Sequence, residues 1–331
     1  MWYRFGKLLS FMSPPLLAPL LLFPPNGTET QAFPHGTVTP ISDQQQGPFL
    51  GLGPPGVTPE LFAPDLVSTG REHSAAMFTP DGTEIWFGRI APTEILFMKQ
   101  TDGVWSQPQA APFSGEHSGL YPSLTSDGNR LFFTSQRPLL PGDPPLPRGQ
   151  GLLWYVERTD TGWSDPEHFG IATDPQSLPS CVSVAANRNL YLALRSLEDS
   201  DSDIYLVRFQ GGRYLEPERI GAIASPAPDH SPFVAPDESY LIWSSFRGGH
   251  GLSDLFISFR GPNGGWSEPR NLGPRINSGA KEEYPYVTPD GRFLFFNSNR
   301  VSALNTRRIP DGPGNIYWVD ATAYVEPSPP L

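Results

Sequence analysis

Short apolar runs recur along the chain, and each follows a turn-forming tripeptide. In the clearest copy, Pro289-Asp290-Gly291 precedes Phe-Leu-Phe-Phe at residues 293–296. Asp can hydrogen-bond its own downstream backbone, and Gly accepts the positive φ that a tight hairpin needs. The pattern therefore predicts two antiparallel strands joined by this turn, and a strained or different turn where Arg188 or Glu238 replaces the glycine. The copies are centred on Asp81, Asp127, Asn187, Asp237 and Asp290.

Two further strands are predicted after each hairpin. The third is an apolar run such as residues 316–319, and the fourth carries an aromatic residue with proline three positions later. Because proline cannot donate to a central ladder, we expect the fourth strand at a sheet edge. Its copies are Trp105 with Pro108, Trp163 with Pro166, Tyr214 with Pro217, and Trp266 with Pro269.

Four short strands per repeat, with successive turns 46 to 60 residues apart, are the sequence signature of a β-propeller. A proline-rich insertion at 138–145, interpreted as a surface loop, explains the longest interval. We therefore predict an all-β fold over residues 56–320: a β-propeller of five four-stranded antiparallel blades, with six blades as the alternative.

The fifth repeat lacks a fourth strand, and a matching segment lies near the N-terminus. Residues 56–68 align with residues 266–278 without a gap, so that Pro59 matches Pro269 and Phe62 matches Leu272. We expect this N-terminal strand to complete the last blade and to cover an edge that would otherwise pair with another chain. The competing candidate is Tyr324 with Pro327, which leaves little room for a turn after Val319.

Composition excludes several partner classes. The formal charge of −11 and the pI near 5.0 argue against a nucleic-acid partner or an anionic membrane surface. The single cysteine, Cys181, excludes an intrachain disulfide and a cysteine-clustered metal site, and its flanks predict a small buried strand residue rather than a nucleophile.

The N-terminus predicts export. Arg4 and Lys7 precede an apolar run at 8–23, interrupted by prolines, and a small-x-small pattern ends at Ala32. We interpret residues 1–32 as a leader or signal segment, 33–55 as a linker and 321–331 as a C-terminal tail. The expected location is periplasmic or extracellular, with no membrane span in the mature chain and a monomeric state. The alternative is a disordered apolar leader.

The repeat resembles that of TolB-like propellers, whose WD-type repeats carry the Pro-Asp-Gly turn. The matching residues are 284–296, then Ser298-Asn299-Arg300, then Asn315-Ile316-Tyr317. This resemblance covers roughly residues 56–320 and implies the fold far more strongly than a function. TolB itself has an additional α/β domain and six blades, so its role in the cell envelope is not carried over.

Arginine follows the second strand of every repeat. A ring of guanidinium groups around one mouth could hold a carboxylate or phosphate ligand. Recurrence in every blade favours a structural role instead, with Asp203 as partner for Arg195 and Asp254 for Arg247. The five are Arg89, Arg137, Arg195, Arg247 and Arg300.

Acidic residues and histidines gather just before the first strand of most repeats, where they should surround an axial funnel. Such groups could ligate a divalent cation or act as general acid and base. The alternative is a solvated, hydrogen-bonded funnel. The set comprises Glu72, His73, Glu116, His117, Asp229, His230, Glu282 and Glu283.

Residues 199–203, Asp-Ser-Asp-Ser-Asp, have the alternating carboxylates of a calcium loop, but they lack the glycine and distal glutamate of an EF-hand. A solvated hairpin tip is the favoured interpretation. We assign no metal site and expect no cofactor, with a divalent cation as the alternative.

Function is less constrained than fold. The chain has no Gly-x-Ser-x-Gly elbow, Walker loop, HExxH or dinucleotide fingerprint. The first hypothesis is therefore a non-enzymatic, exported binding or scaffold propeller that takes a protein, peptide or glycan partner at an axial mouth. The second is a carbohydrate-active hydrolase or lyase that uses the acidic residues and histidines of the funnel.

Overall fold

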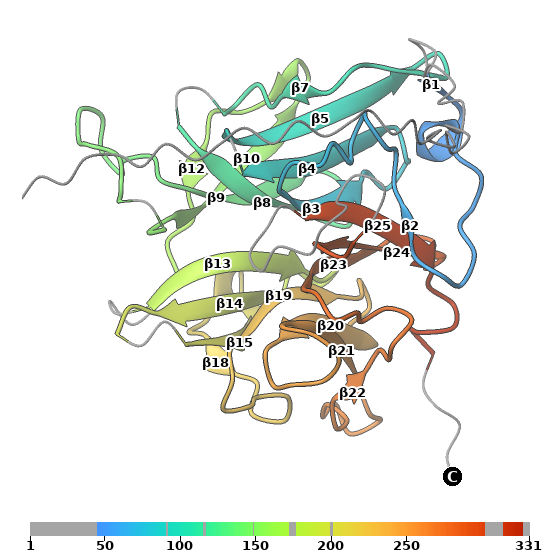
Figure 1. Ribbon diagram of the computed structural model, residues 1–331. Coiled ribbons are helices and arrows are strands. Elements are labelled where there is room, and N and C mark those ends of the chain that lie inside the picture. Colours follow the sequence, from blue (N-terminus) through green and yellow to red (C-terminus); the bar gives the residue numbers. More distant parts are fainter. Residues whose placement is uncertain are drawn as a thin grey trace, which may run out of the picture. The chain divides into compact units, whose positions relative to one another are not determined.

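Five antiparallel sheets follow one another along the chain and form the blades of a β-propeller (Figure 1). The computed structural model describes residues 45–90, 92–114, 117–147, 149–171, 177–198, 201–301 and 314–326. The predicted fold class and the count of five blades are confirmed. In these ranges the only helical element is a 3₁₀ turn, η1 (Pro48–Gly51).

The strands run outward in chain order in blades 1 to 4, whereas the outermost strand of blade 5 is the N-terminal β2 (Glu60–Leu61). Blade 1 contains β3 (His73–Phe78), β4 (Glu84–Ile90), β5 (Thr93–Thr101) and β7 (Gln109–Ala110), with β6 (Val104–Trp105) paired to β5 and β1 (Gln45–Gln46) paired to β6. Blade 2 contains β8 (Gly119–Leu124), β9 (Arg130–Ser135), β10 (Leu152–Thr159) and β12 (Glu167–His168), with β11 (Gly162–Trp163) paired to β10. Blade 3 contains β13 (Ser177–Val184), β14 (Leu190–Ser196), β15 (Ser202–Val207) and β18 (Glu218–Arg219), beside the hairpin β16 (Phe209–Gln210) and β17 (Arg213–Tyr214). Blade 4 contains β19 (Asp229–Val234), β20 (Tyr240–Ser245), β21 (Asp254–Phe259) and β22 (Arg270–Asn271), and blade 5 contains β23 (Glu282–Val287), β24 (Phe293–Ser298), β25 (Asn315–Asp320) and β2 (Glu60–Leu61).

The Asp turns work as the sequence predicts. Asp81 accepts hydrogen bonds from the Thr79 hydroxyl at 2.6 Å and from the Thr83 backbone N–H at 3.0 Å, and Gly82 has a φ of 68°. Arg188 and Glu238 replace the glycine with φ values of 73° and 59°, so these two side-chain-bearing residues adopt the left-handed conformation. The predicted strain at both positions is therefore confirmed.

The fourth strand begins after the proline rather than containing it. In blade 4, Pro269 immediately precedes β22, whose Arg270 and Asn271 pair with Ile257 and Phe256. Proline at the entrance of an edge strand leaves every ladder donor in place. The recurring spacing therefore marks a strand at the sheet edge, as predicted, but the prediction that this strand carries the aromatic residue was wrong, since that residue lies before the proline and outside the edge strand.

The N-terminal strand closes the ring. Glu60 and Leu61 of β2 pair with Trp318 and Tyr317 of β25, and the Phe62 N–H donates to Ile316 O at 2.9 Å. Phe62 is fully buried, with its ring 5.0 Å from that of Phe295 and 5.2 Å from that of Trp318. The competing residue, Tyr324, instead donates its hydroxyl proton to Val57 O.

Residues that pair or pack with the blades continue beyond both ends of the predicted propeller, residues 56–320. Within the predicted linker, β1 pairs with β6, and Leu50 of η1 is fully buried in the apolar core beside blade 1. Within the predicted tail, Ala321 and Tyr324 are buried against blade 5. The predicted leader, residues 1–32, lies outside the described residues. No helix in the described ranges is long and apolar enough to cross a membrane.

Candidate functional site

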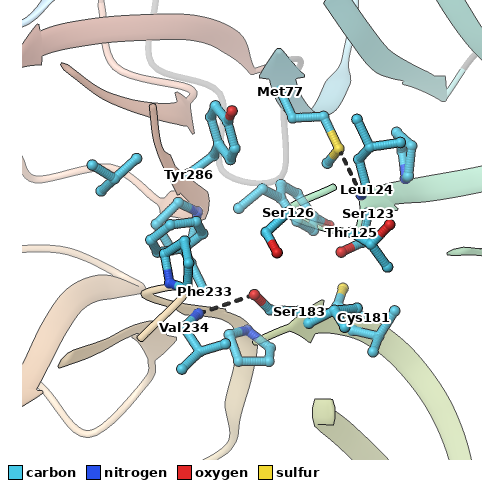
Figure 2. Close-up of a pocket in the computed structure, with 18 of the residues that line it drawn as sticks. Met77, Ser123, Leu124, Thr125, Ser126, Cys181, Ser183, Phe233, Val234 and Tyr286 are labelled. Atoms are coloured by element: carbon cyan, nitrogen blue, oxygen red, sulfur yellow. Dashed lines mark hydrogen bonds between the residues drawn. The ribbon is translucent and has the colours of Figure 1, made fainter. Parts of the chain in front are cut away.

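The first strands of the five blades line a central channel that holds two cavities. The first, which we call the turn chamber, has a volume of about 290 Å³ and lies at the end of the channel marked by the Asp turns. Its wall is mainly apolar and rich in proline (Figure 2). The side chains that define it include Met77, Leu124, Val182, Phe233 and Tyr286.

Polar groups of the turn chamber are largely satisfied within its wall. The Tyr286 hydroxyl donates to Phe78 O at 3.1 Å and accepts from Phe78 N–H at 3.2 Å. Ser183 Oγ accepts from Val234 N–H at 3.0 Å, and Met77 Sδ accepts from Leu124 N–H at 3.1 Å (Figure 2). Because these groups are already paired, the chamber offers an apolar surface to a ligand.

The second cavity, which we call the funnel chamber, has a volume of about 600 Å³ and occupies the opposite end of the channel. Its wall is more polar. It includes hydroxyl and amide side chains from blades 2 and 3, the Arg195 guanidinium group and His230 from blade 4. The insertion of blade 2 borders it, because the Gln136 side chain at the wall donates to Pro147 O at 2.8 Å.

Four residues line both chambers and so form the partition between them: Tyr121, Cys181, Ser231 and Tyr284. Each comes from a different blade. The rings of Tyr121 and Tyr284 stack at 5.2 Å, and the Cys181 sulfur lies 3.8 Å from Ser231 Oγ. Burial raises the pKa of the Cys181 thiol to about 12, which keeps it protonated and inert near neutral pH, as predicted for a buried cysteine.

The partition is built from strained backbone. Tyr121, Ser231 and Tyr284 have φ values of 55°, 51° and 55°, and each lies where the register between the first two strands shifts. Left-handed conformation in tyrosine is a genuine outlier, and such strain concentrates at functional sites. The strained backbone therefore makes the partition a candidate functional site within the channel.

The five predicted arginines divide into two groups. Arg137, Arg247 and Arg300 form a repeated Ser-x-Arg motif, in which the Nε–H donates to the serine two positions earlier and the terminal NH₂ donates to a carbonyl oxygen 24 residues earlier. Arg89 instead contacts Glu94, and Arg195 donates to Gly149 O at the edge of the funnel chamber.

The predicted partners of two arginines were wrong. Arg247 binds Asp229 at 2.8 and 2.9 Å, whereas Asp254 accepts from the backbone N–H groups of His250 and Gly251. Asp203 is held by Arg219 at 2.6 and 2.8 Å, not by Arg195. The sequence puts each acid near the start of a neighbouring strand, but the blade register decides which arginine reaches it.

Two of the predicted funnel acids serve these arginines. Asp229 is 1% exposed and also accepts from Trp243 Nε1–H at 3.1 Å. Glu282 is fully buried and accepts from Arg300 at 3.1 Å and from the Ser298 and Ser278 hydroxyls at 2.8 and 2.6 Å. Both carboxylates therefore hold the structure of their own blades together.

The predicted acid-His pairs do not occupy equivalent positions in their blades: His73 of blade 1 corresponds to the acid Asp229 of blade 4, not to His230. His73, Gly119, Asp229 and Glu282 occupy the same position of the first strand, opposite Arg89, Ser135, Ser245 and Ser298. His73 is 1% exposed, and burial lowers its pKa to about 4. Glu72 is exposed, His117 is partly buried, and Glu116 lies outside the described residues.

Of the predicted set, His230 is the residue that lines a chamber. Its Nδ1 lies 2.9 Å from Ser231 Oγ, and its Nε2 lies 3.7 Å from Glu283 Oε1. Burial is the main cause that lowers its pKa to about 4; Asp229 opposes the shift, and Lys281 adds to it. His230 is therefore neutral at pH 7 and places its two ring nitrogens toward a hydroxyl and a carboxylate.

The described residues hold no group of three or more His, Cys, Asp or Glu side chains that could bind a metal ion. Asp199 of the calcium-like loop lies outside the described residues, and Asp203 is committed to Arg219.

Sequence reasoning missed Tyr121, Ser231 and Tyr284. A signal was present: Pro122, Pro232 and Pro285 each stand five residues before a turn Asp, and each follows one of the three strained residues.

The chain is similar in structure to several solved propellers. A putative TolB from Agrobacterium tumefaciens is 15% identical, with a TM-score of 0.48 over 76% of this chain and 90% of that one. TolB from Acinetobacter baumannii is 14% identical, with a TM-score of 0.44 over 76% of this chain and 57% of that one. An endo-arabinase from Bacteroides thetaiotaomicron is 16% identical, with a TM-score of 0.49 over 81% and 97%.

No family model and no curated protein sequence matches the chain. The five-bladed fold agrees with the TolB-like repeat signature of residues 284–296. At these identities the likeness concerns the fold.

Proposed function

We propose that this protein is a binding propeller that takes a peptide or glycan segment in its central channel, entering through the funnel chamber. One observation carries the proposal. Most of the predicted funnel acids that the structure describes are bound to arginines or lie outside the chamber wall, whereas two cavities of about 290 and 600 Å³ lie along the axis. Concave, mostly pre-formed cavities lined by apolar side chains and a few polar groups are the usual form of a ligand site.

The chemistry of the funnel chamber suits such a ligand. Hydroxyl and amide side chains such as Ser118 and Gln136 line its wall, together with the exposed face of Phe246. Hydroxyls and amides exchange hydrogen bonds with peptide and sugar groups, and an aromatic face packs against either. The net charge of −11 further disfavours polyanionic ligands.

A peptide and glycan array probed with the full chain tests this proposal. Leu178 is partly buried and lines the funnel chamber, so the L178W substitution should fill it and weaken binding at least 10-fold. Val301 is 58% exposed and is not part of either chamber wall, so V301F is the matched control and should bind like the natural protein. Equal binding by both variants would place the ligand outside the channel.

A carbohydrate-active hydrolase is the second candidate. The contact between His230 and Glu283 at the funnel chamber is the observation that favours it. Glycoside hydrolysis uses two carboxyl groups that flank the scissile bond. Asp229 and Glu282 are engaged by Arg247 and Arg300, and Glu283 reaches the chamber only through its contact with His230. This arrangement supports the binding role more strongly than glycosidase chemistry.

Export to the periplasm or exterior belongs to the same proposal, on the strength of the N-terminal pattern at residues 1–32. N-terminal sequencing of the protein recovered from the producing cells tests it. A mature N-terminus near residue 33 in an extracytoplasmic fraction is expected, and an intact Met1 in the cytoplasmic fraction would contradict it.

A further inference from the structure

Ser231, His230 and Glu283 form a chain of polar contacts at the partition. Ser231 Oγ lies 2.9 Å from His230 Nδ1, and His230 Nε2 lies 3.7 Å from Glu283 Oε1. Ser231 lines both chambers, and the His230 ring packs 5.4 Å from the ring of Phe246. A hydroxyl, an imidazole and a carboxylate in this order are the components of a Ser-His-acid hydrolase.

The protonation state of His230 suits the role of a base. Its pKa of about 4 leaves the ring neutral at pH 7, so one nitrogen carries a proton and the other can accept one. A carboxylate facing Nε2 favours the tautomer with the proton on that nitrogen, which leaves Nδ1 free to accept from Ser231. The 3.7 Å separation from Glu283 is longer than a hydrogen bond, and such contacts are often looser in ligand-free enzymes.

The backbone presents Ser231 in an unusual way. Its φ of 51° and the register shift between His230 and Phe233 take it out of the regular ladder of β19 and β20. Catalytic serines of hydrolases commonly lie on sharp, strained turns that expose Oγ. The equivalent positions in blades 2 and 5 carry Tyr121 and Tyr284, so the hydroxyl next to a histidine is a feature of blade 4 alone among these three.

We propose that Ser231, His230 and Glu283 act together to hydrolyse carboxylic esters at the partition of the channel. Ser231 Oγ attacks the carbonyl carbon while its proton passes to His230 Nδ1. The tetrahedral intermediate collapses, the bond to the alcohol oxygen breaks, and the alcohol leaves with the proton from His230. Water then attacks the acyl-serine, gives its proton to His230, and the carboxylic acid is released as Ser231 Oγ regains a proton.

The two chambers define the class of ester. The acyl group would occupy the turn chamber, whose wall is apolar and whose volume of about 290 Å³ exceeds the ~150 Å³ that holds benzene. The alcohol would occupy the funnel chamber, where hydroxyl and amide groups favour a polar, hydroxylated fragment. An apolar or aromatic acyl ester of a sugar or another polyol fits both.

One phenol group is available to the developing oxyanion: the Tyr284 hydroxyl donates to that of Tyr121, which leaves the Tyr121 proton to be donated. Tyr121 and Tyr284 line both chambers beside Ser231, and burial raises the pKa of each phenol well above its usual value. Both hydroxyls therefore stay protonated near neutral pH, where His230 is also neutral. Protonated donors near the reacting carbon are what stabilises a tetrahedral oxyanion.

The full chain tested against a fluorophosphonate probe and against p-nitrophenyl butyrate decides the proposal. We expect covalent labelling at Ser231, found by mass spectrometry, and hydrolysis above the buffer rate. The S231A variant should lose both, with residual hydrolysis at the buffer rate. Ser258 is a matched control, because it is fully buried, lines neither chamber and has no adjacent histidine, so S258A should retain both signals.

The H230Q variant should lower kcat about 100-fold or more with KM little changed. Glu283 is a positioning residue, so E283Q should lower kcat less and shift the pH profile. Folding of every variant is checked by its thermal unfolding transition. Labelling of natural protein and S231A alike, or no hydrolysis by a folded natural protein, would overturn the proposal.

The proposal rests on the channel being a ligand site, and its failure can be told from failure of the binding role. If the natural protein binds on the array, L178W does not, and Ser231 is not labelled, the binding role is supported and the esterase proposal is rejected. If Ser231 is labelled and nothing on the array is bound, the esterase proposal is supported and the peptide- or glycan-binding role is rejected.

Discussion

Buried ionisable side chains carry most of the specific chemistry of this propeller. Asp229 and Glu282 are almost completely buried yet paired with Arg247 and Arg300, so their charges are compensated. His73 and the partly buried His230 stay neutral at pH 7, because desolvation lowers the pKa of each to about 4. Residues of the same predicted set thus have opposite roles, because burial favours charge only where a counter-charge is present.

Removal of the Asp229 carboxylate should be costly. The D229L substitution leaves the Arg247 guanidinium group in a largely buried site without its ion pair, which typically lowers the free energy of unfolding by about 3–5 kcal/mol. The double variant D229L/R247M should recover much of that loss, because neither charge then remains. Urea unfolding of both variants checks this. A double variant as unstable as the single one would contradict it.

Acid should destabilise the fold through His73. Its pKa in the folded state, about 4, is lower than the ordinary value of 6.5, so the unfolded chain binds more protons between these values. The stabilisation is fully present above pH 6.5 and is lost as the pH falls toward 4, by about 3 kcal/mol for a shift of this size. Urea midpoints at pH 7 and pH 4.5 measure the loss, which should be smaller in H73F. An equal loss in H73F would assign it to other groups.

The proposed esterase should keep its rate to unusually low pH. Asp229 on β19, and Lys281 and Glu283 at the start of β23, are the charged groups near His230, and the net result is a pKa of about 4. The value of kcat/KM should therefore stay constant from pH 8 to pH 5 and fall near pH 4, whereas an ordinary histidine base would lose activity below pH 6.5. Initial rates with p-nitrophenyl butyrate provide the profile, corrected for hydrolysis in buffer.

Strands and turns followed from local sequence, whereas side-chain partners did not. The Asp turns and the proline before each edge strand depend on residues close together in the chain, and the closing strand was predicted because residues 56–68 repeat the local pattern of residues 266–278. The pairing of Arg247 with Asp229 depends on the register between β19 and β20, and on a carbonyl oxygen 24 residues earlier at Ile223. The strained partition depends on the meeting of several blades, so its residues could be noticed in the sequence only as an x-Pro step before the turn.

The closing strand should contribute strongly to stability for its length. Phe62 follows β2, is fully buried, and packs against Phe78, Phe295 and Trp318. The F62A substitution should lower the free energy of unfolding by about 3–5 kcal/mol, since it leaves a cavity between the first and last blades. Leu140 is 65% exposed, so L140A is the control and should change stability by less than about 0.5 kcal/mol. Equal effects of the two substitutions in urea unfolding would contradict this role.

At the scale of the molecule, five copies of one sheet serve different purposes at the axis. Every blade supplies a first strand to the channel, but the residue at the register shift differs: tyrosine in blades 2 and 5, and serine beside histidine in blade 4. The repeated fold therefore places one residue of each of these blades at the axis, and the identity of that residue in each blade determines the chemistry available there. This is the reason that the fold could be predicted from recurrence, while the candidate site lies where recurrence breaks.

The pairing of β2 with β25 also sets an order of events. The strand at Glu60–Leu61 is made early on the ribosome, yet its partners, Tyr317 and Trp318, emerge only when synthesis is almost finished. Contacts between residues so far apart in sequence form late, because the entropy of closing the intervening chain must be overcome first. Until then β2 lacks its partner strand, and Phe62 lacks its contacts with Phe295 and Trp318. The nascent protein should therefore depend on being held unfolded or protected until its last blade is complete, a requirement that transport across a membrane as an extended chain would also meet.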